Sequence, residues 1–343
     1  MIGFDVGTYN LVCCKRDEKN NFVYKREVNA FIEVPMKDRL VFNMMKNAVD
    51  EETGAPCVPL IEVKDAGVAY ALGEAALRIA YSMPALEVKR PMKAGCLNPK
   101  EKHAQQIMGI MVHSLIEKAT DKDLLYYCIP ANAINEETDS DYHSLVLKSM
   151  FDAFKDDENH TVVANPINEG LALVYAELAK KAYTGLGISF GAGMVNLCFS
   201  VFGSPIFQFA LVNSGDWIDH QSARATGESE SYINREKMNV DLTVNSDSLV
   251  HRAIKAQYEI MIQKTVNGIK KGLEETGKVR AEHPIDIVIA GGTSSPKGFD
   301  TLFADAIKKV NLPIELGQVI RPADPLYSVA RGCLLAAEAA SKE

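Results

Sequence analysis

Residues 2–16 have the sequence IGFDVGTYNLVCCKR, in which two apolar stretches are separated by a turn that begins at Gly7. Apolar runs broken by turn residues predict strands, here at residues 2–6, 10–16 and 22–28. Glycine suits the first turn, because a residue without a side chain lets amide N–H groups approach a phosphate closely. The start of the chain therefore predicts a hairpin that is able to bind phosphate.

The same pattern returns at residues 186–202, LGISFGAGMVNLCFSVF. Its first turn is Gly191-Ala192-Gly193, and the strands of this second copy are predicted at residues 186–190, 194–202 and 206–212. A chain that builds one unit twice is expected to form two similar lobes. Two such turns, facing each other across a cleft, would hold a triphosphate from opposite sides.

A third glycine turn, Gly291-Gly292-Thr293, follows a strand predicted at residues 284–290. Backbone N–H groups at the carboxyl end of a strand, before a helix, are a common place for ligands in α/β folds. Further helices are predicted at residues 101–119, 137–154, 167–181, 250–276 and 299–310, further strands at 125–129 and 161–164, and an irregular surface region at 222–247. Alternating elements of this kind predict an α/β fold with mixed sheets and flanking helices.

Length and charge narrow the class of protein. With 343 residues and 47% hydrophobic content, the chain is long enough for two cores. The balance of 45 acidic and 37 basic residues gives a net charge of −8, which disfavours a nucleic-acid or anionic-membrane partner. No GxxxxGK[ST] or GxGxxG motif occurs, so phosphate-loop and dinucleotide-binding classes are not supported.

Cysteine and histidine usage points to a reduced, cytoplasmic protein. The seven cysteines include no CxxC motif and the seven histidines no HxxxH motif, so no metal held by Cys or His is expected. The chain starts directly in a predicted strand, without a signal peptide, and it has no stretch of about 18 apolar residues. We therefore expect neither secretion nor membrane attachment.

The three turns together resemble motifs of the ATPase superfamily that includes actin, the seventy-kilodalton heat-shock chaperones and the sugar kinases. Residues 3–10 resemble its first phosphate motif, residues 188–196 its second and residues 287–294 its adenosine motif, in the same order along the chain. Asn165-Pro166 and residues 324–332 resemble its two interlobe connections. The stretches at residues 71–76 and 90–95 are most similar to bacterial actins of the MreB and MamK type.

This resemblance implies an actin-like fold, in which two ribonuclease-H-like lobes of mixed sheet and helices surround a nucleotide cleft. Lobe I is expected to comprise residues 1–164 and 324–343, with a small insertion at about 31–75. Lobe II is expected at residues 165–323, with an insertion at about 216–276.

The resemblance also implies roles for individual residues. Asp5 is expected to hold Mg²⁺, mostly through water, and Ser189 stands where the family has an aspartate. Asn165 stands where the family has a Glu or Gln that orients the attacking water, and an amide cannot accept the proton of that water. We therefore expect slow hydrolysis, or its loss.

The nucleotide itself is expected to contact all three turns. The expected contacts are Gly7, Thr8, Tyr9, Asn10, Gly191, Ala192, Gly193, Gly291, Gly292 and Thr293. Glu236 and Lys237 are either ribose and base contacts or a solvated charge pair. ATP or ADP with Mg²⁺ would be the cofactor.

Family analogy predicts a cytoplasmic, bacterial-type protein that polymerises into cytoskeletal filaments and carries a cargo or adaptor protein. One alternative is a monomeric chaperone-like or assembly-factor ATPase that acts on a partner. Another is a nucleotide-binding scaffold that has lost hydrolysis, which Ser189 and Asn165 would explain. A sugar kinase is disfavoured by the short chain.

Overall fold

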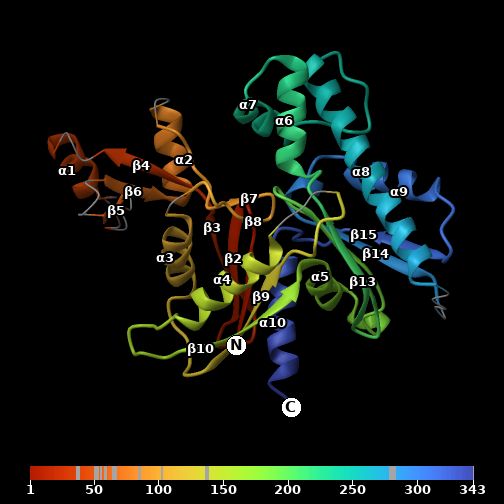
Figure 1. Cartoon of the computed structure of the whole chain (residues 1–343), viewed down its shortest axis with the longest axis horizontal. Coiled ribbons are helices and arrows are strands. Elements are labelled where there is room, and N and C mark those ends of the chain that lie inside the picture. Colours follow the sequence, from red (N-terminus) through yellow and green to blue (C-terminus); the bar gives the residue numbers. More distant parts are fainter. Residues whose placement is uncertain are drawn as a thin grey trace.

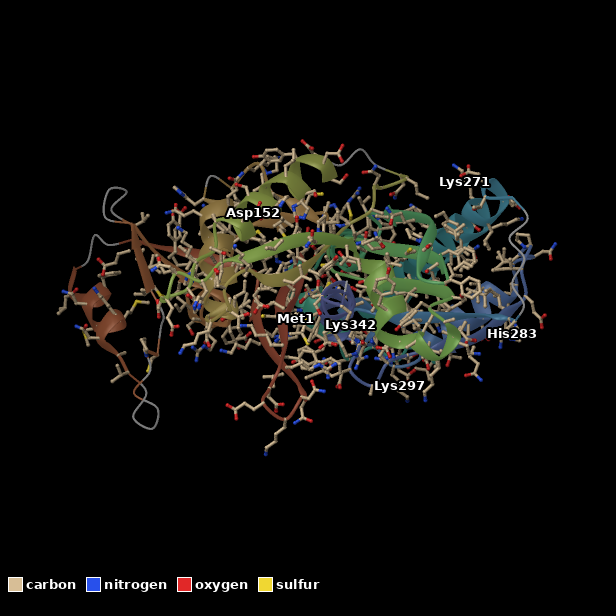
Figure 2. All side chains as sticks on the ribbon, turned by 90° about the horizontal axis from the view of Figure 1, so that it is seen from below. Met1, Asp152, Lys271, His283, Lys297 and Lys342 are labelled. Atoms are coloured by element: carbon tan, nitrogen blue, oxygen red, sulfur yellow. The ribbon has the colours of Figure 1, made fainter. Side chains whose placement is uncertain are left out.

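The structure is a computed structural model that describes residues 1–35, 39–49, 54, 56–57, 60–63, 68–83, 86–101, 103–135, 139–277 and 283–342. Two sheets lie side by side, and helices α5 (Glu169–Glu177) and α10 (Ser328–Ala340) run between them (Figure 1). Both chain termini lie at the lower end of the molecule in Figure 1, and in the view from below Met1 and Lys342 lie near the centre (Figure 2).

The first sheet has the order β10-β9-β1-β2-β3. Its strands are β1 (Ile2–Val6), β2 (Asn10–Arg16), β3 (Phe22–Val28), β9 (Asp123–Ile129) and β10 (Val162–Asn168). Strands β1, β2 and β3 pair antiparallel, whereas β1, β9 and β10 pair parallel. The three strands predicted at the start of the chain therefore form one half of this sheet.

The second sheet has the equivalent order, β13-β12-β11-β14-β15. Its strands are β11 (Gly185–Phe190), β12 (Val195–Val201), β13 (Ser204–Leu211), β14 (Ile285–Ala290) and β15 (Leu316–Ile320). Strands β11, β12 and β13 pair antiparallel, whereas β11, β14 and β15 pair parallel. The internal repeat predicted from the sequence is thus a repeat of sheet topology, and the α/β class with two mixed sheets is confirmed.

Helices cover both sheets and complete two cores. Helices α3 (Ala104–Ile116) and α4 (Ser140–Asp152) pack on the first sheet, and α8 (Leu249–Glu275) and α9 (Phe299–Lys308) pack on the second. Periodic apolar residues of α8, such as Ile254, Met261 and Ile269, are buried in the second core. This burial is what the 3.6-residue period of that segment predicts.

Small residues let the two central helices approach the sheets closely. A Cβ atom on Gly332 of α10 would overlap the backbone oxygen of Ala172 in α5. A Cβ atom on Gly170 of α5 would overlap the backbone nitrogen of Cys198 in β12. Helix α10 therefore packs backbone to backbone on α5, and α5 packs in the same way on β12 of the second sheet.

Smaller elements extend each half at the end away from the chain termini (Figure 1). A three-stranded sheet of β4 (Phe31–Pro35), β6 (Val68–Leu72) and β5 (Leu60–Val63), with α1 (Arg39–Asn47) and α2 (Gly73–Ser82), belongs to the first half. The hairpin of β7 (Met92–Lys93) and β8 (Cys96–Leu97) follows. Helices α6 (Gly215–Thr226) and α7 (Glu230–Lys237) belong to the second half.

Some sequence expectations were wrong. The region expected to be irregular at residues 222–247 contains the end of α6 and all of α7, whose N-cap is Ser229. The helix expected from Ile167 begins at Glu169, because β10 continues through Asn168. The expected boundary between residues 164 and 165 lies within β10, and parts of the predicted 31–75 insertion lie outside the described residues, so the division into two lobes stays a prediction. Within the described ranges, no helix has the length and apolarity needed to cross a membrane.

Candidate functional site

The glycine turns of the two sheets meet. The turn after β1 contains Thr8, and the turn after β11 contains Gly193. A Cβ atom on Gly193 would overlap the Thr8 hydroxyl and lie 2.5 Å from the backbone nitrogen of Gly95. Gly193 therefore has no room for a side chain, and its contact brings the two halves of the molecule together.

A cavity of about 350 Å³ opens beside this contact. It is lined by all of the predicted site residues except Asn165 and Glu236, that is by Asp5, Gly7, Thr8, Tyr9, Asn10, Ser189, Gly191, Ala192, Gly193, Lys237, Gly291, Gly292 and Thr293. The turns that the sequence places far apart thus converge on one cavity, contributed by both sheets.

Asp5 is the penultimate residue of strand β1 and lines the cavity. The thiol of Cys128, on the neighbouring strand β9, donates a hydrogen bond to Asp5 Oδ1 at 3.0 Å. Cys128 Sγ in turn accepts one from the backbone N–H of Val6 at 3.1 Å. Burial raises the pKa of the Asp5 carboxyl, and the Cys128 hydrogen bond works against that rise.

Asn165 lies outside the cavity lining. It is in β10, paired with Tyr126 of β9, and its side-chain amide donates to the backbone oxygen of Val163 at 3.5 Å. The strand was expected to end at Ala164, before Asn165-Pro166, but it continues for four more residues to Asn168. The structure therefore does not place Asn165 where a water bound beside the phosphates would be.

Glu169 occupies the place expected for the residue that orients the attacking water, since it is the first residue of α5 and lines the cavity. The sequence contains a signal for it, because Asn168 is an N-cap residue followed by an acidic first-turn residue. In the structure the Asn168 side chain accepts hydrogen bonds from the backbone N–H groups of Gly170 at 2.9 Å and Leu171 at 3.2 Å.

The Glu169 carboxyl has a polar environment within a buried site. Its pKa is raised first by burial and then by the negative charge of Asp5. Hydrogen bonds with the side chains of Ser189 and Asn196 act in the opposite direction. The charges of Asp5 and Glu169 thus interact, and Ser189, which stands where the resembled motif has an aspartate, lines the same cavity.

Helix α7 lines another part of the cavity with Asn234 and Lys237, which are one helical turn apart. Lys237 Nζ lies 2.7 Å from Asp219 Oδ1 and donates to the backbone oxygen of Gly215 at 3.0 Å. Asn234 donates to Asp219 Oδ2 at 2.7 Å. Buried Asp219 therefore anchors both side chains, and the sequence analysis missed Asn234.

Glu236, between these two residues in sequence, faces elsewhere. Its carboxylate lies 3.4 Å from His251 Nε2 of α8, and it is absent from the cavity lining. Only Lys237 of the predicted pair contributes to the site.

The third turn is fastened to the second. Thr293 Oγ1 donates to the backbone oxygen of Gly191 at 2.8 Å. Gly291 adopts φ +93°, which a residue with a side chain rarely adopts, and its N–H donates to the backbone oxygen of Pro325 at 3.1 Å. These bonds connect the turn after β14 with the turn after β11 and with the segment before α10.

Arg90 connects the two halves at the edge of the cavity. Arg90 Nη1 lies 2.9 Å from Asp216 Oδ1, and the Arg90 guanidinium lies 4.8 Å from the centre of the Tyr9 ring. The backbone N–H of Asp216 donates to the oxygen of Ala192 at 2.8 Å. One arginine thus links the first glycine turn, through Tyr9, with the second, through Asp216.

A family model described as Volactin matches residues 1–337. The chain belongs to the Volactin family. A search of curated proteins finds no match for this Volactin-family chain.

Solved structures resemble the Volactin-family chain over almost its whole length. The MamK double helical filament has 17% identity and a TM-score of 0.68, with 98% of each chain covered. MreB5 of Spiroplasma citri bound to ADP has 13% identity and a TM-score of 0.62, covering 99% of this chain and 97% of that one. The ethanolamine utilization protein EutJ from Carboxydothermus hydrogenoformans has 15% identity and a TM-score of 0.51, covering 97% and 88%. At these identities the likeness shows the fold, and it confirms the actin-like fold expected from the sequence.

Proposed function

We propose that this Volactin-family chain binds ATP with Mg²⁺ in the cavity between its two sheets, hydrolyses it slowly to ADP and phosphate, and assembles into filaments. One observation carries the proposal: equivalent glycine turns from two equivalent sheets meet at a cavity that also contains two carboxylates, Asp5 and Glu169.

The turns supply phosphate ligands. Backbone N–H groups of residues 8–9 and 192–193 bind the phosphate oxygens from opposite sides, since the glycine turns allow close approach. The N–H groups of Gly7 and Gly191 close the two turns by donating to the backbone oxygens of Asn10 and Met194. The resemblance to MreB5 bound to ADP supports an adenine nucleotide as the ligand. Residues of α7 and of the turn after β14 then border the nucleoside.

The residues present fit Mg²⁺. Asp5 offers carboxylate oxygens, the ligand type that Mg²⁺ prefers, and phosphate oxygens and water complete its coordination. In the described part of the chain no group of three or more His, Cys, Asp and Glu side chains is placed to hold a metal alone. When bound, Mg²⁺ would neutralise charge that develops on the phosphates.

Hydrolysis is assigned to Glu169. A carboxylate at this position orients the attacking water and accepts its proton, which the Asn165 amide cannot do. The burial that raises the Glu169 pKa makes its carboxylate a stronger base, although it also lowers the fraction of the group that is deprotonated at neutral pH. The presence of Glu169 in the cavity therefore favours hydrolysis over a scaffold that has lost it.

Filament formation follows from coupling between the nucleotide and the two halves. ATP contacts both glycine turns and so favours the arrangement in which they meet, provided that it binds this arrangement better than an open one. Head-to-tail assembly needs one heterologous interface, and the likeness to the MamK double helical filament supports such assembly. A cytoplasmic location and a cargo or adaptor protein complete the proposal, and all seven cysteines are free thiols, the usual state in a reducing compartment.

The test is assembly and turnover in the same tubes. Purified protein is incubated with Mg²⁺ and ATP, ADP or no nucleotide, and pelleting and released phosphate are followed against protein concentration. The proposal predicts a critical concentration for assembly with ATP, accompanied by phosphate release. A chain that releases phosphate but stays monomeric at every concentration would instead be an ATPase that acts on a partner protein.

A further inference from the structure

Cys128 contacts the carboxylate of Asp5 without lining the cavity itself. It is fully buried on β9. Its thiol donates a hydrogen bond to Asp5 Oδ1 at 3.0 Å, and its Sγ accepts one from the backbone N–H of Val6 at 3.1 Å. The sulfur therefore uses both its hydrogen and a lone pair on the last two residues of β1.

These two hydrogen bonds connect β9 with β1 beyond the backbone pairing of the two strands, which ends at Phe4 and Tyr127. Cys128 is the next residue of β9, and there it is paired with Ile167 of β10. Because β9 lies between β1 and β10 in the sheet, the backbone of Cys128 is held on both sides. The thiol is thus a fixed donor for Asp5.

The thiol determines how the Asp5 carboxylate is presented to the cavity. Among the described residues, Cys128 is the only hydrogen-bond donor to this carboxylate, and it takes Oδ1. Oδ2 is therefore the oxygen that remains for a cation or for a water bound to one. A neutral thiol orients the carboxylate without cancelling its negative charge, as a lysine or arginine would do.

We propose that Cys128 is a positioning residue for Asp5, which fixes this carboxylate in the orientation that holds Mg²⁺ with ATP. The inference rests on the proposed function, in which Asp5 is the metal ligand. Hydrogen-bond partners of ligating carboxylates orient them, and loss of such a partner typically lowers metal affinity about 10- to 100-fold.

Cys128→Ala and Cys128→Ser separate the hydrogen bond from the filling of space. Alanine removes the donor, whereas the serine hydroxyl keeps a donor and an acceptor at nearly the same place. The readout is the Mg²⁺ concentration that gives half of the gain in ATP affinity, from calorimetric titrations with ATP at a series of Mg²⁺ concentrations. It should rise about 10-fold or more in Cys128→Ala and stay near the wild-type value in Cys128→Ser.

Two controls show that the effect is specific to the metal. The Kd for ATP without Mg²⁺ should stay near the wild-type value in both Cys128 variants. Cys198→Ala removes another fully buried thiol, on β12 and outside the cavity lining, and should keep the wild-type Mg²⁺ dependence.

A double-mutant cycle with Asp5→Ala tests the contact itself, without nucleotide or metal. Cys128→Ala leaves the Asp5 carboxylate without its donor and should lower the melting temperature. In the Asp5→Ala background the acceptor is already gone, so the same substitution should lower the melting temperature less.

The possible results are distinct. A raised Mg²⁺ requirement in Cys128→Ala that serine restores, together with coupled melting temperatures, supports the proposal. A wild-type requirement in Cys128→Ala, an equal rise in Cys128→Ser or Cys198→Ala, or additive melting temperatures overturn it. If the wild-type chain binds ATP equally well with and without Mg²⁺, the proposed metal site fails, and the cycle of melting temperatures still decides whether Cys128 holds Asp5.

Discussion

Replacing Glu169 with glutamine should remove most phosphate release while leaving ATP binding intact. Among the described residues that line the cavity, Asp5 and Glu169 are the only carboxylates, and Asp5 is assigned to the metal. Glutamine keeps the size of the side chain but cannot accept a proton. A positioned general base contributes about 10²- to 10⁴-fold in rate, which corresponds to about 3–5 kcal/mol in the activation free energy.

The fold should survive this change. Glu169 is buried and is repelled by Asp5, so a neutral amide removes an unfavourable charge interaction. The melting temperature of Glu169→Gln without nucleotide should therefore be at least that of the wild type. Thermal melting and an ATP titration check folding and binding separately from catalysis.

Single-turnover phosphate release is the decisive assay, with Asn165→Ala as the matched control. Asn165 lies outside the cavity lining, so its variant should release phosphate at nearly the wild-type rate. The reasoning is refuted if Glu169→Gln keeps the wild-type rate, or if Asn165→Ala loses as much activity as Glu169→Gln.

Three further outcomes are expected. Lys237→Met leaves Asp219 buried without its partner and should lower the free energy of unfolding, measured by urea denaturation, by about 3–5 kcal/mol. Adding Asp219→Asn should recover much of this loss. Burial lowers the pKa of His143 to about 4, so only the unfolded chain gains this proton as the pH falls from about 6.5. The free energy of unfolding should therefore drop by about 3 kcal/mol by pH 4, and by less in His143→Gln, as measured by unfolding at a series of pH values. Gly193→Ala forces a Cβ atom onto the Thr8 hydroxyl and should weaken ATP binding about tenfold or more, by calorimetric titration; unchanged affinity would show that the turns need not meet.

Local signals in the sequence predicted the sheets well. Strands β1, β2 and β3 begin and end where the apolar runs and turns of residues 2–28 predict, because buried strands and glycine turns are both local properties. Helix α7 was missed because its surface is polar. Its N-cap, Ser229, is a start signal that composition alone concealed.

The candidate site was predicted only in part, because its remaining residues depend on contacts between distant segments. The sequence analysis aligned the first interlobe connection of the superfamily with Asn165-Pro166. In the structure β10 extends to Asn168 before α5 begins, so Glu169 is the residue that lines the cavity. Nothing local indicates that Ser189 and Glu169 line the same cavity, since these residues belong to different elements. Likewise, Asp219 anchors Lys237 from another helix.

The central claim is that the cavity between the two sheets binds ATP, and calorimetric titration of the wild-type chain with ATP, with and without Mg²⁺, tests it most directly. The account predicts saturable binding of one ATP per chain, tighter with Mg²⁺ than without it. No saturable binding at millimolar ATP under either condition would contradict the account.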